Sequence, residues 1–153
     1  MINDVFLSAG VGVLLALVLS VPAIAWEVRR KRHEGHPLLV DIDTFGGRKL
    51  SDRESFALGI LFQLVLGLFF GLLYPFNPSF WSFAGEAYTF LSVTAYALVL
   101  YLIATGIVMP FMGMGVLGWR EDKWIWLETL FTMALMVVGY ILIVHWFQPS
   151  WFA

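Results

Sequence analysis

Four long apolar runs without a single lysine or arginine constrain this chain more than any other feature of its sequence. A helix needs about 20 residues to cross the roughly 30 Å hydrocarbon core of a bilayer. In lipid, each backbone amide must find its partner within the segment, and the runs lack the alternating polarity of barrel strands. We therefore predict an all-α integral membrane protein with four transmembrane helices in one up-down bundle. The expected spans are residues 5–26, 55–76, 88–112 and 124–147.

The composition narrows the function classes. Hydrophobic residues make up 60% of the 153 residues and charged residues 13%, whereas a soluble domain has about 25% charged residues. The chain has no cysteine, which excludes disulfides and thiol chemistry. The hydrophilic segments are too short to form a domain with its own core. We expect no catalytic site, no metal or other cofactor, and no nucleic-acid partner.

All lysines and arginines fall in two of the connecting segments. The first connection, residues 27–54, carries seven of the nine, and Arg120 and Lys123 are the other two. Basic loops stay on the cytoplasmic side of a membrane. We therefore expect residues 27–54 to be a basic cytoplasmic loop of a protein in the cell (inner) membrane, with both ends of the chain outside. The run Arg29, Arg30, Lys31 and Arg32 is expected to contact anionic lipid headgroups, at about 1 kcal/mol per residue.

Aromatic residues flank the runs on both sides, and we expect them to form interfacial belts. The expected inner belt comprises Trp26, Trp119, Trp124 and Trp126. The expected outer belt comprises Tyr74, Phe80, Trp81, Phe83, Tyr88, Trp146 and Trp151.

Small residues recur at every fourth position of the first two runs. Such stripes lie on one helix face and let two backbones approach closely. We expect them to pack the first helix against the second, or alternatively against a second copy or another subunit. The stripe residues are Ser8, Gly12, Ala16 and Ser20 in the first run and Gly59, Gly67 and Gly71, with Gln63 among them, in the second.

Two polar residues inside the runs are candidates for a transport path. Gln63 falls level with the interval between Ala16 and Ser20, and we expect it to bond the Ser20 hydroxyl. Glu128 lies in the first turns of the fourth helix, where the helix dipole favours a carboxylate by about 0.3–1 kcal/mol. A structural role is the simpler explanation of both, although an ionisable residue inside a span is a functional candidate.

Residues 113–118, GMGVLG, match the G-x-G-x-x-G pattern of dinucleotide-binding loops. That pattern binds pyrophosphate where it joins a strand to a helix in a βαβ unit. Here an expected transmembrane helix precedes it, and Pro110 weakens the end of that helix. We therefore interpret the glycines as a turn at the cytoplasmic surface.

The cytoplasmic loop holds three further patterns. Residues 51–54, SDRE, fit a capping box at the start of the second helix. Residues 38–47, LLVDIDTFGG, predict a short strand-like or interfacial piece that ends in a Gly-Gly turn. His33, His36 and Asp41 could ligate a metal, but their spacing does not match H-E-x-x-H.

Three functions follow from these patterns. The one we favour, motivated by the near-absence of buried polar groups, is a non-catalytic membrane protein. It would be an accessory or assembly subunit, or a lipid-interacting scaffold, with the bilayer, a second copy or another membrane protein as its partner. The alternative is a small oligomeric transporter or channel that uses Gln63 and Glu128, with Thr105, Tyr96 or Tyr101. The third is a membrane-surface enzyme that uses His33, His36 and Asp41.

Overall fold

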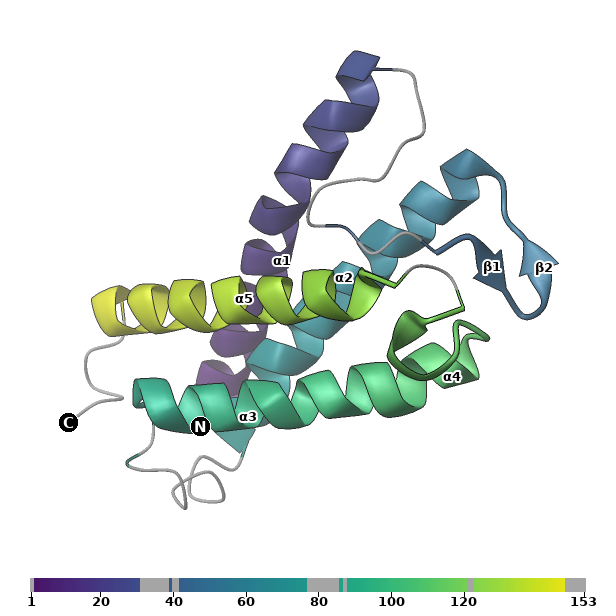
Figure 1. Ribbon diagram of the computed structural model, residues 1–153. Coiled ribbons are helices and arrows are strands. Elements are labelled where there is room, and N and C mark those ends of the chain that lie inside the picture. The colour runs from purple at the N-terminus through teal and green to yellow at the C-terminus, as the bar shows by residue number, and fades with distance from the viewer. Residues whose placement is uncertain are drawn as a thin grey trace.

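The computed structural model describes residues 2–30, 39, 42–76, 86, 88–120 and 123–147 (Figure 1). Within these ranges, four helical stretches are long and apolar enough to cross a membrane: Asn3–Ala25, Asp52–Pro75, Phe90–Phe111 and Ile125–Phe147. Each end of these stretches lies within three residues of the end expected from the sequence.

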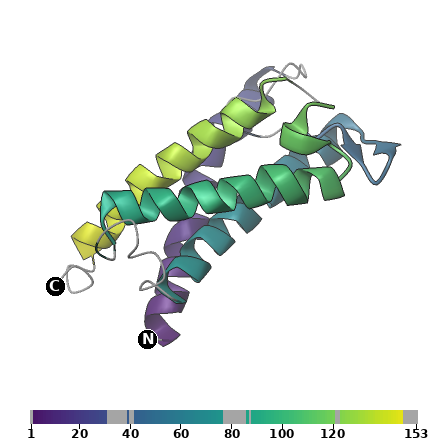
Figure 2. The ribbon, with the colours of Figure 1, turned by 60° about the horizontal axis from the view of Figure 1, so that its bottom comes forward.

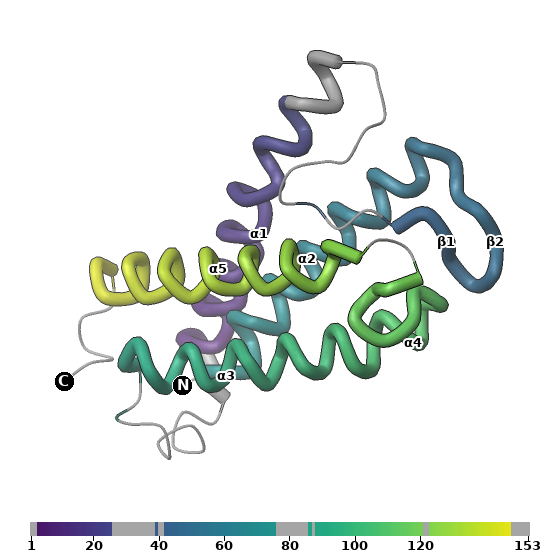
Figure 3. The backbone as a smooth tube through the Cα atoms, in the orientation of Figure 1, coloured from purple at the N-terminus to yellow at the C-terminus, as the bar shows by residue number. Residues whose placement is uncertain are grey.

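The first two spans form a helical hairpin. Helix α1 (Ile2–Arg30) and helix α2 (Asp52–Phe76) approach most closely over the first half of α1 and then separate toward the start of α2 (Figure 3). Helix α2 begins as the capping-box pattern predicts. The backbone N–H of Ser51 donates to the Glu54 carboxylate (2.9 Å), and the Ser51 carbonyl accepts from the N–H of Ser55 (2.8 Å).

The third span changes helix type before it ends. Helix α3 (Phe90–Ile103) runs into a π-helical turn, Ala104–Val108, which is followed by the short helix α4 (Met109–Phe111). Pro110 supplies the physical reason, because it has no N–H to donate and its ring would collide with the carbonyl of an ordinary preceding turn. The wider turn accommodates the ring, and the N–H of Met109 reaches the carbonyl of Ala104, five residues back.

The fourth span, helix α5 (Ile125–Phe147), packs against α3 and α1. The spans alternate in direction. The start of α1, the start of α3 and the end of α5 lie at one end of the molecule, opposite α4 and the start of α2 (Figure 2). The observed order is therefore that of an up-down bundle, in which the α1–α2 hairpin leans across the α3–α5 pair (Figures 1 and 2).

A small β-hairpin precedes α2 and is the part of the described structure that departs from the expected all-α architecture. Strand β1 (Thr44–Phe45) pairs antiparallel with β2 (Arg48–Lys49). The two loop residues, Gly46 and Gly47, have φ of +59° and +81°, and positive φ at both central positions is what a type I′ hairpin turn requires. Of the piece expected over residues 38–47, Thr44–Phe45 is a strand and the Gly-Gly turn follows it, whereas residues 38, 40 and 41 lie outside the described residues.

Two hydrophobic cores hold the bundle together. The larger core lies among the four spans and contains all five tyrosines of the chain, together with Phe70. The smaller one, which we call the hairpin-end core, lies at the end that carries the β-hairpin and α4. It consists of Ile42, Phe62, Ala104, Met109, Met114 and Ile125.

Candidate functional site

The glycine-rich turn after α4 has the backbone geometry of a helix C-cap. The N–H of Gly113 donates to the Pro110 carbonyl and that of Met114 to the Met109 carbonyl, both at 3.0 Å, which is the bond pattern of a Schellman motif. Gly113 has the positive φ that this motif demands, +93°. Met109 and Met114 are both fully buried, and they supply the apolar contact that accompanies the motif.

Four backbone donors in and beside this turn bond carbonyl oxygens within residues 109–115. Besides those of Gly113 and Met114, the N–H of Gly118 bonds the Gly115 carbonyl, and that of Arg120 bonds the Met114 carbonyl (3.1 Å). A phosphate-binding loop must instead direct such N–H groups at its ligand. The turn follows a helix, as expected, so the match of 113–118 to a nucleotide motif is one of letters only.

The seam between α1 and α2 is occupied within the chain. A Cβ added to Gly67 would lie 2.6 Å from the Cβ of Ala16, and one added to Gly12 would lie 2.9 Å from the backbone nitrogen of Gly71. Ser8 and Ser20 are fully buried, and Gly59, nearer the start of α2, is also buried. Gly12 therefore lies against α2 of the same chain, and Gly67 and Gly71 lie against α1.

Gln63 lies at the expected level but has a different partner. Its side-chain nitrogen donates to the backbone carbonyl of Ala16 at 3.4 Å. The expected acceptor was the Ser20 hydroxyl, which instead donates to the same Ala16 oxygen at 2.8 Å. Serine hydroxyls in helices commonly bond the carbonyl one turn back, and here that bond leaves Gln63 to reach the backbone.

A small cavity of about 10 Å³ lies beside Gln63, between α2 and α5. Glu128, the other candidate for a path, is half-buried in the first turn of α5 and is not among the cavity residues. The structure therefore does not bring the two together around one cavity. The cavity is lined by Phe62, Gln63, Leu66, Thr129, Thr132, Met133 and Met136.

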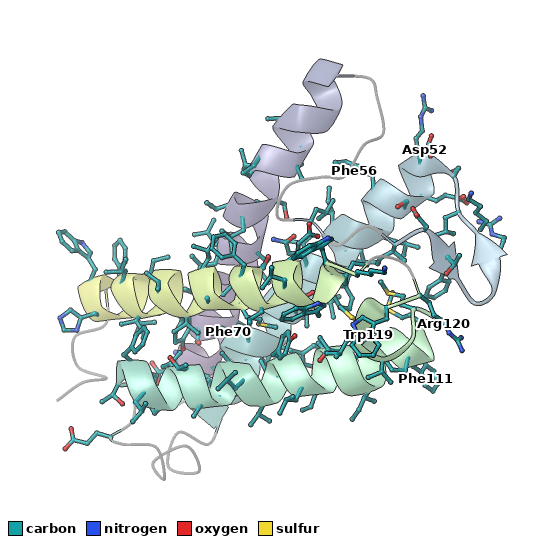
Figure 4. The ribbon with its side chains drawn as sticks, in the orientation of Figure 1. Asp52, Phe56, Phe70, Phe111, Trp119 and Arg120 are labelled. Carbon is teal, nitrogen blue, oxygen red and sulfur yellow. The ribbon has the colours of Figure 1, made fainter. Side chains whose placement is uncertain are left out.

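Sequence reasoning missed a cluster of aromatic side chains in the larger core. We call this set the tyrosine cluster: Tyr74, Tyr88, Tyr96 and Tyr140, with Phe70. Tyr74 lies at its centre, because its ring contacts those of the other three tyrosines. Phe70 packs against Tyr96 and Tyr140, with ring centroids 5.5 and 5.4 Å apart, and Figure 4 shows Phe70 between the α3–α5 pair and α2. Tilted and edge-to-face contacts of this kind contribute about 0.5–1.5 kcal/mol each beyond their buried area.

Each hydroxyl of the cluster that lies within a span joins two helices. Tyr140 and Ser8 lie 2.6 Å apart and join α5 to α1. Tyr74 bonds Ser92 at 2.8 Å and joins α2 to α3. Tyr96 donates to the carbonyl of Phe69 at 2.7 Å and so gives α3 a second bond to α2.

Tyr88, just before the third span, completes the cluster. It has a positive φ of 62°, which is uncommon for a residue other than glycine. Its backbone N–H donates to the Tyr74 hydroxyl at 2.7 Å, which fixes this conformation. Burial, with smaller contributions from Tyr74 and Asp4, raises the pKa of the Tyr88 phenol to about 12.

The tyrosine cluster corrects two expectations. Tyr74 and Tyr88 were expected in the outer interfacial belt, but both are buried inside the bundle. Their hydroxyls find partners on neighbouring helices, which makes burial of the rings favourable. The expected scarcity of buried polar groups is also wrong, because Ser8, Ser92 and Thr105 are buried as well.

Three other members of the expected belts are exposed, and Trp126 is half-buried. Phe80, Trp81, Phe83, Trp151 and the side chain of Trp26 lie outside the described residues. Trp119 and Trp124 are exposed at the hairpin end, and Trp146 near the opposite end. Figure 4 shows Phe111, Trp119 and Arg120 gathered around α4.

We found no match to this chain among protein-family models, curated proteins or solved structures. The site must therefore be judged by its own chemistry.

The remaining site expectations lie mostly outside the described residues. Arg29 and Arg30 complete α1, but their side chains lie outside the description, as do Lys31 and Arg32. His33, His36 and Asp41 also lie outside it. Among the residues that are described, no group of three histidine, aspartate or glutamate side chains could hold a metal ion.

The polar groups within the described spans are arranged for cohesion. Every buried side-chain nitrogen or oxygen in the described part of the chain has a hydrogen-bond partner. The three residues considered for a transport path illustrate this: Tyr96 bonds α2, Thr105 bonds the Tyr101 carbonyl (2.7 Å), and Tyr101 bonds the Trp126 carbonyl (3.1 Å). The bonds of Tyr96 and Tyr101 join neighbouring helices, and in hydrocarbon such bonds hold helices in one relative position, whereas that of Thr105 lies within its own span.

Proposed function

We propose that this chain is a non-catalytic membrane protein that acts as an accessory or assembly subunit, or as a lipid-interacting scaffold. The observation that carries the proposal is the internal satisfaction of its buried polar side chains in the described residues. Catalytic and transport sites keep polar groups directed at a substrate or a water-filled path. Here the hydroxyls of Ser8, Tyr74 and Tyr96 bond backbone and side chains of neighbouring helices instead.

We further propose that the protein lies in the cell (inner) membrane with the hairpin end in the cytoplasm. The β-hairpin, the start of α2 and the turn before α5 carry Arg48, Lys49, Arg53, Arg120 and Lys123, and these lie at one end of the molecule (Figure 1). Positively charged residues are retained on the cytoplasmic side during insertion. Because the chain has no cysteine, single cysteines can be introduced at Lys49 and His145 without a background. An impermeant thiol reagent added outside intact cells should label His145→Cys and spare Lys49→Cys.

An accessory role is tested by removing the protein from the cell that makes it. We expect deletion to lower the abundance or assembly of a specific membrane complex, measured by native electrophoresis and quantitative proteomics. The wild-type gene should restore it. Gly12→Leu, which would drive a side chain into α2, should fail, whereas Gly10→Leu should restore it because nothing lies within 4 Å of a Cβ at Gly10. Unchanged membrane complexes after deletion would argue against an assembly role.

The alternative is a small oligomeric transporter or channel, and one observation favours it. The cavity beside Gln63 also carries the hydroxyl-bearing residues Thr129 and Thr132. Flux through proteoliposomes that contain the purified protein decides between the two proposals. Transport that Gln63→Leu and Glu128→Gln abolish would defeat the non-catalytic proposal, and an absence of flux for ions and small solutes would support it.

A further inference from the structure

We propose that the cavity between α2 and α5 is a binding site for one water molecule, which links Gln63 to Thr129 and Thr132. The inference goes beyond the proposed function, because it holds whether the chain is an assembly subunit or a transporter. It assigns a ligand to Gln63, a polar residue that is buried within the second span.

The amide of Gln63 has hydrogen-bonding capacity beyond its protein contact. The side chain is 3% exposed, and its bond to the Ala16 carbonyl is 3.4 Å long, whereas N–H···O bonds in proteins are usually about 2.7–3.2 Å. The same carbonyl oxygen already accepts the shorter bond from Ser20, at 2.8 Å. A glutamine amide carries two donor hydrogens and an acceptor oxygen, and this one weak contact uses a single hydrogen.

The facing helix supplies complementary groups. Thr129 is 1% exposed, and its hydroxyl hydrogen is committed to the Ile125 carbonyl at 2.8 Å. Its oxygen can therefore accept a hydrogen bond but has no hydrogen left to donate. Thr132, 9% exposed, adds a hydroxyl one helical turn farther along the same cavity. A water molecule, with two donors and two acceptor sites, can bond both threonines and the amide together.

The size and charge of the cavity select water over other ligands. Its volume of about 10 Å³ reaches the lower limit of roughly 10–15 Å³ at which a cavity holds one water, and buried waters need two to four polar partners. The residues lining it include no charged side chain, so a cation that lost its hydration shell would find no compensating charge. A lipid chain would leave the amide and the hydroxyls without partners.

Water-edited solid-state NMR of the threonine-labelled protein in bilayers tests the proposal directly. Thr105 is the internal control, because it is 1% exposed, bonds the Tyr101 carbonyl and does not line the cavity. Thr105 lies six residues before the end of the third span at Phe111, and Thr132 lies seven residues after the start of α5 at Ile125, so their depths are comparable. We expect water magnetisation to reach Thr129 and Thr132 faster than it reaches Thr105. Equal transfer to all three would overturn the proposal.

Variants separate a bound water from general hydration. In Gln63→Leu, the transfer to Thr132 should fall to the level of Thr105, whereas Thr94→Val, on α3 and outside the cavity, should leave it unchanged. In a double-mutant cycle, Gln63→Leu and Thr132→Val should each lower the unfolding midpoint, and together they should lower it by less than the sum. Additive losses, or water retained at Thr132 in Gln63→Leu, would show that no water links the two residues. The wild-type measurement stands even if a variant does not fold.

Discussion

The hydroxyl groups of Ser8 and Tyr140 lie 2.6 Å apart, although 132 residues separate them in sequence. Ser8 gives its only hydrogen to the Gly71 carbonyl, also at 2.6 Å, so Tyr140 must be the donor to Ser8. Three helices are joined in this way through one serine. The absence of a side chain at Gly71 makes the contact possible, because a Cβ there would lie 2.9 Å from the Cα of Ala9.

These hydrogen bonds predict that removing the Ser8 hydroxyl destabilises the protein more than removing the Tyr140 hydroxyl does. Tyr140→Phe should cost about 0.6–1.7 kcal/mol, the range found for hydrogen bonds between membrane helices, because Ser8 keeps its bond to Gly71. Ser8→Ala should cost more, because it leaves the buried Tyr140 hydroxyl without a partner. Reversible unfolding in mixed micelles measures both losses.

The double variant supplies the control for this prediction. Ser8→Ala combined with Tyr140→Phe removes the stranded hydroxyl, so it should be no less stable than Ser8→Ala alone. Additive losses would show that the two hydroxyls act independently, contrary to the observed bond.

The seam between α1 and α2 predicts a second contrast, between two glycines of the same helix. Gly12→Ala should destabilise the protein by about 1–3 kcal/mol, the usual cost of overpacking, because a Cβ there meets the backbone of α2. Gly10→Ala should be neutral or stabilising by up to about 1 kcal/mol, since alanine favours the helix and the position is open. Equal unfolding midpoints for the two variants would show that the seam does not carry the packing.

The glycine-rich turn predicts a third contrast. Gly113 and Gly118 both have positive φ, of +93° and +72°, so alanine at either adds backbone strain of about 1–2 kcal/mol. Only at Gly118 does the new methyl also approach a neighbour, the Cγ2 atom of Ile125, at 2.7 Å. Gly118→Ala should therefore lower the thermal midpoint more than Gly113→Ala does, and the reverse order would contradict the packing of the turn against α5.

Local patterns in the sequence were enough to predict the spans, the start of α2 and the contact between α1 and α2. The lengths of the apolar runs placed the spans, and the SDRE pattern placed the start of α2 at Asp52. The period of four among small residues identified the α1–α2 contact. Each of these inferences depends on neighbours within one or two helical turns, where residue spacing determines geometry.

The partners of individual side chains could not be predicted, because they depend on contacts between distant segments. The expected bond of Gln63 to Ser20 failed because Ser20 bonds its own helix. Tyr74 was expected at the membrane interface because tyrosine favours that position, and the sequence gives no sign that Ser92 and the Tyr88 backbone would satisfy its hydroxyl. The presence of tyrosine in spans that carry few other polar residues was the one available indication.

The hairpin-end core predicts that residues before the β-hairpin stabilise the bundle. Ile42 is fully buried against the side chains of Phe62 and Met114, whereas Phe45, three residues later in the hairpin, is 48% exposed. Ile42→Ala should lower the free energy of unfolding by about 2–5 kcal/mol, as loss of a buried isoleucine side chain usually does. It should also speed hydrogen exchange at the Leu50 amide, which bonds the Asp43 carbonyl at 2.8 Å. Phe45→Ala, the matched control, should leave that exchange rate nearly unchanged, and similar rates in the two variants would show that Ile42 does not hold the hairpin against the bundle.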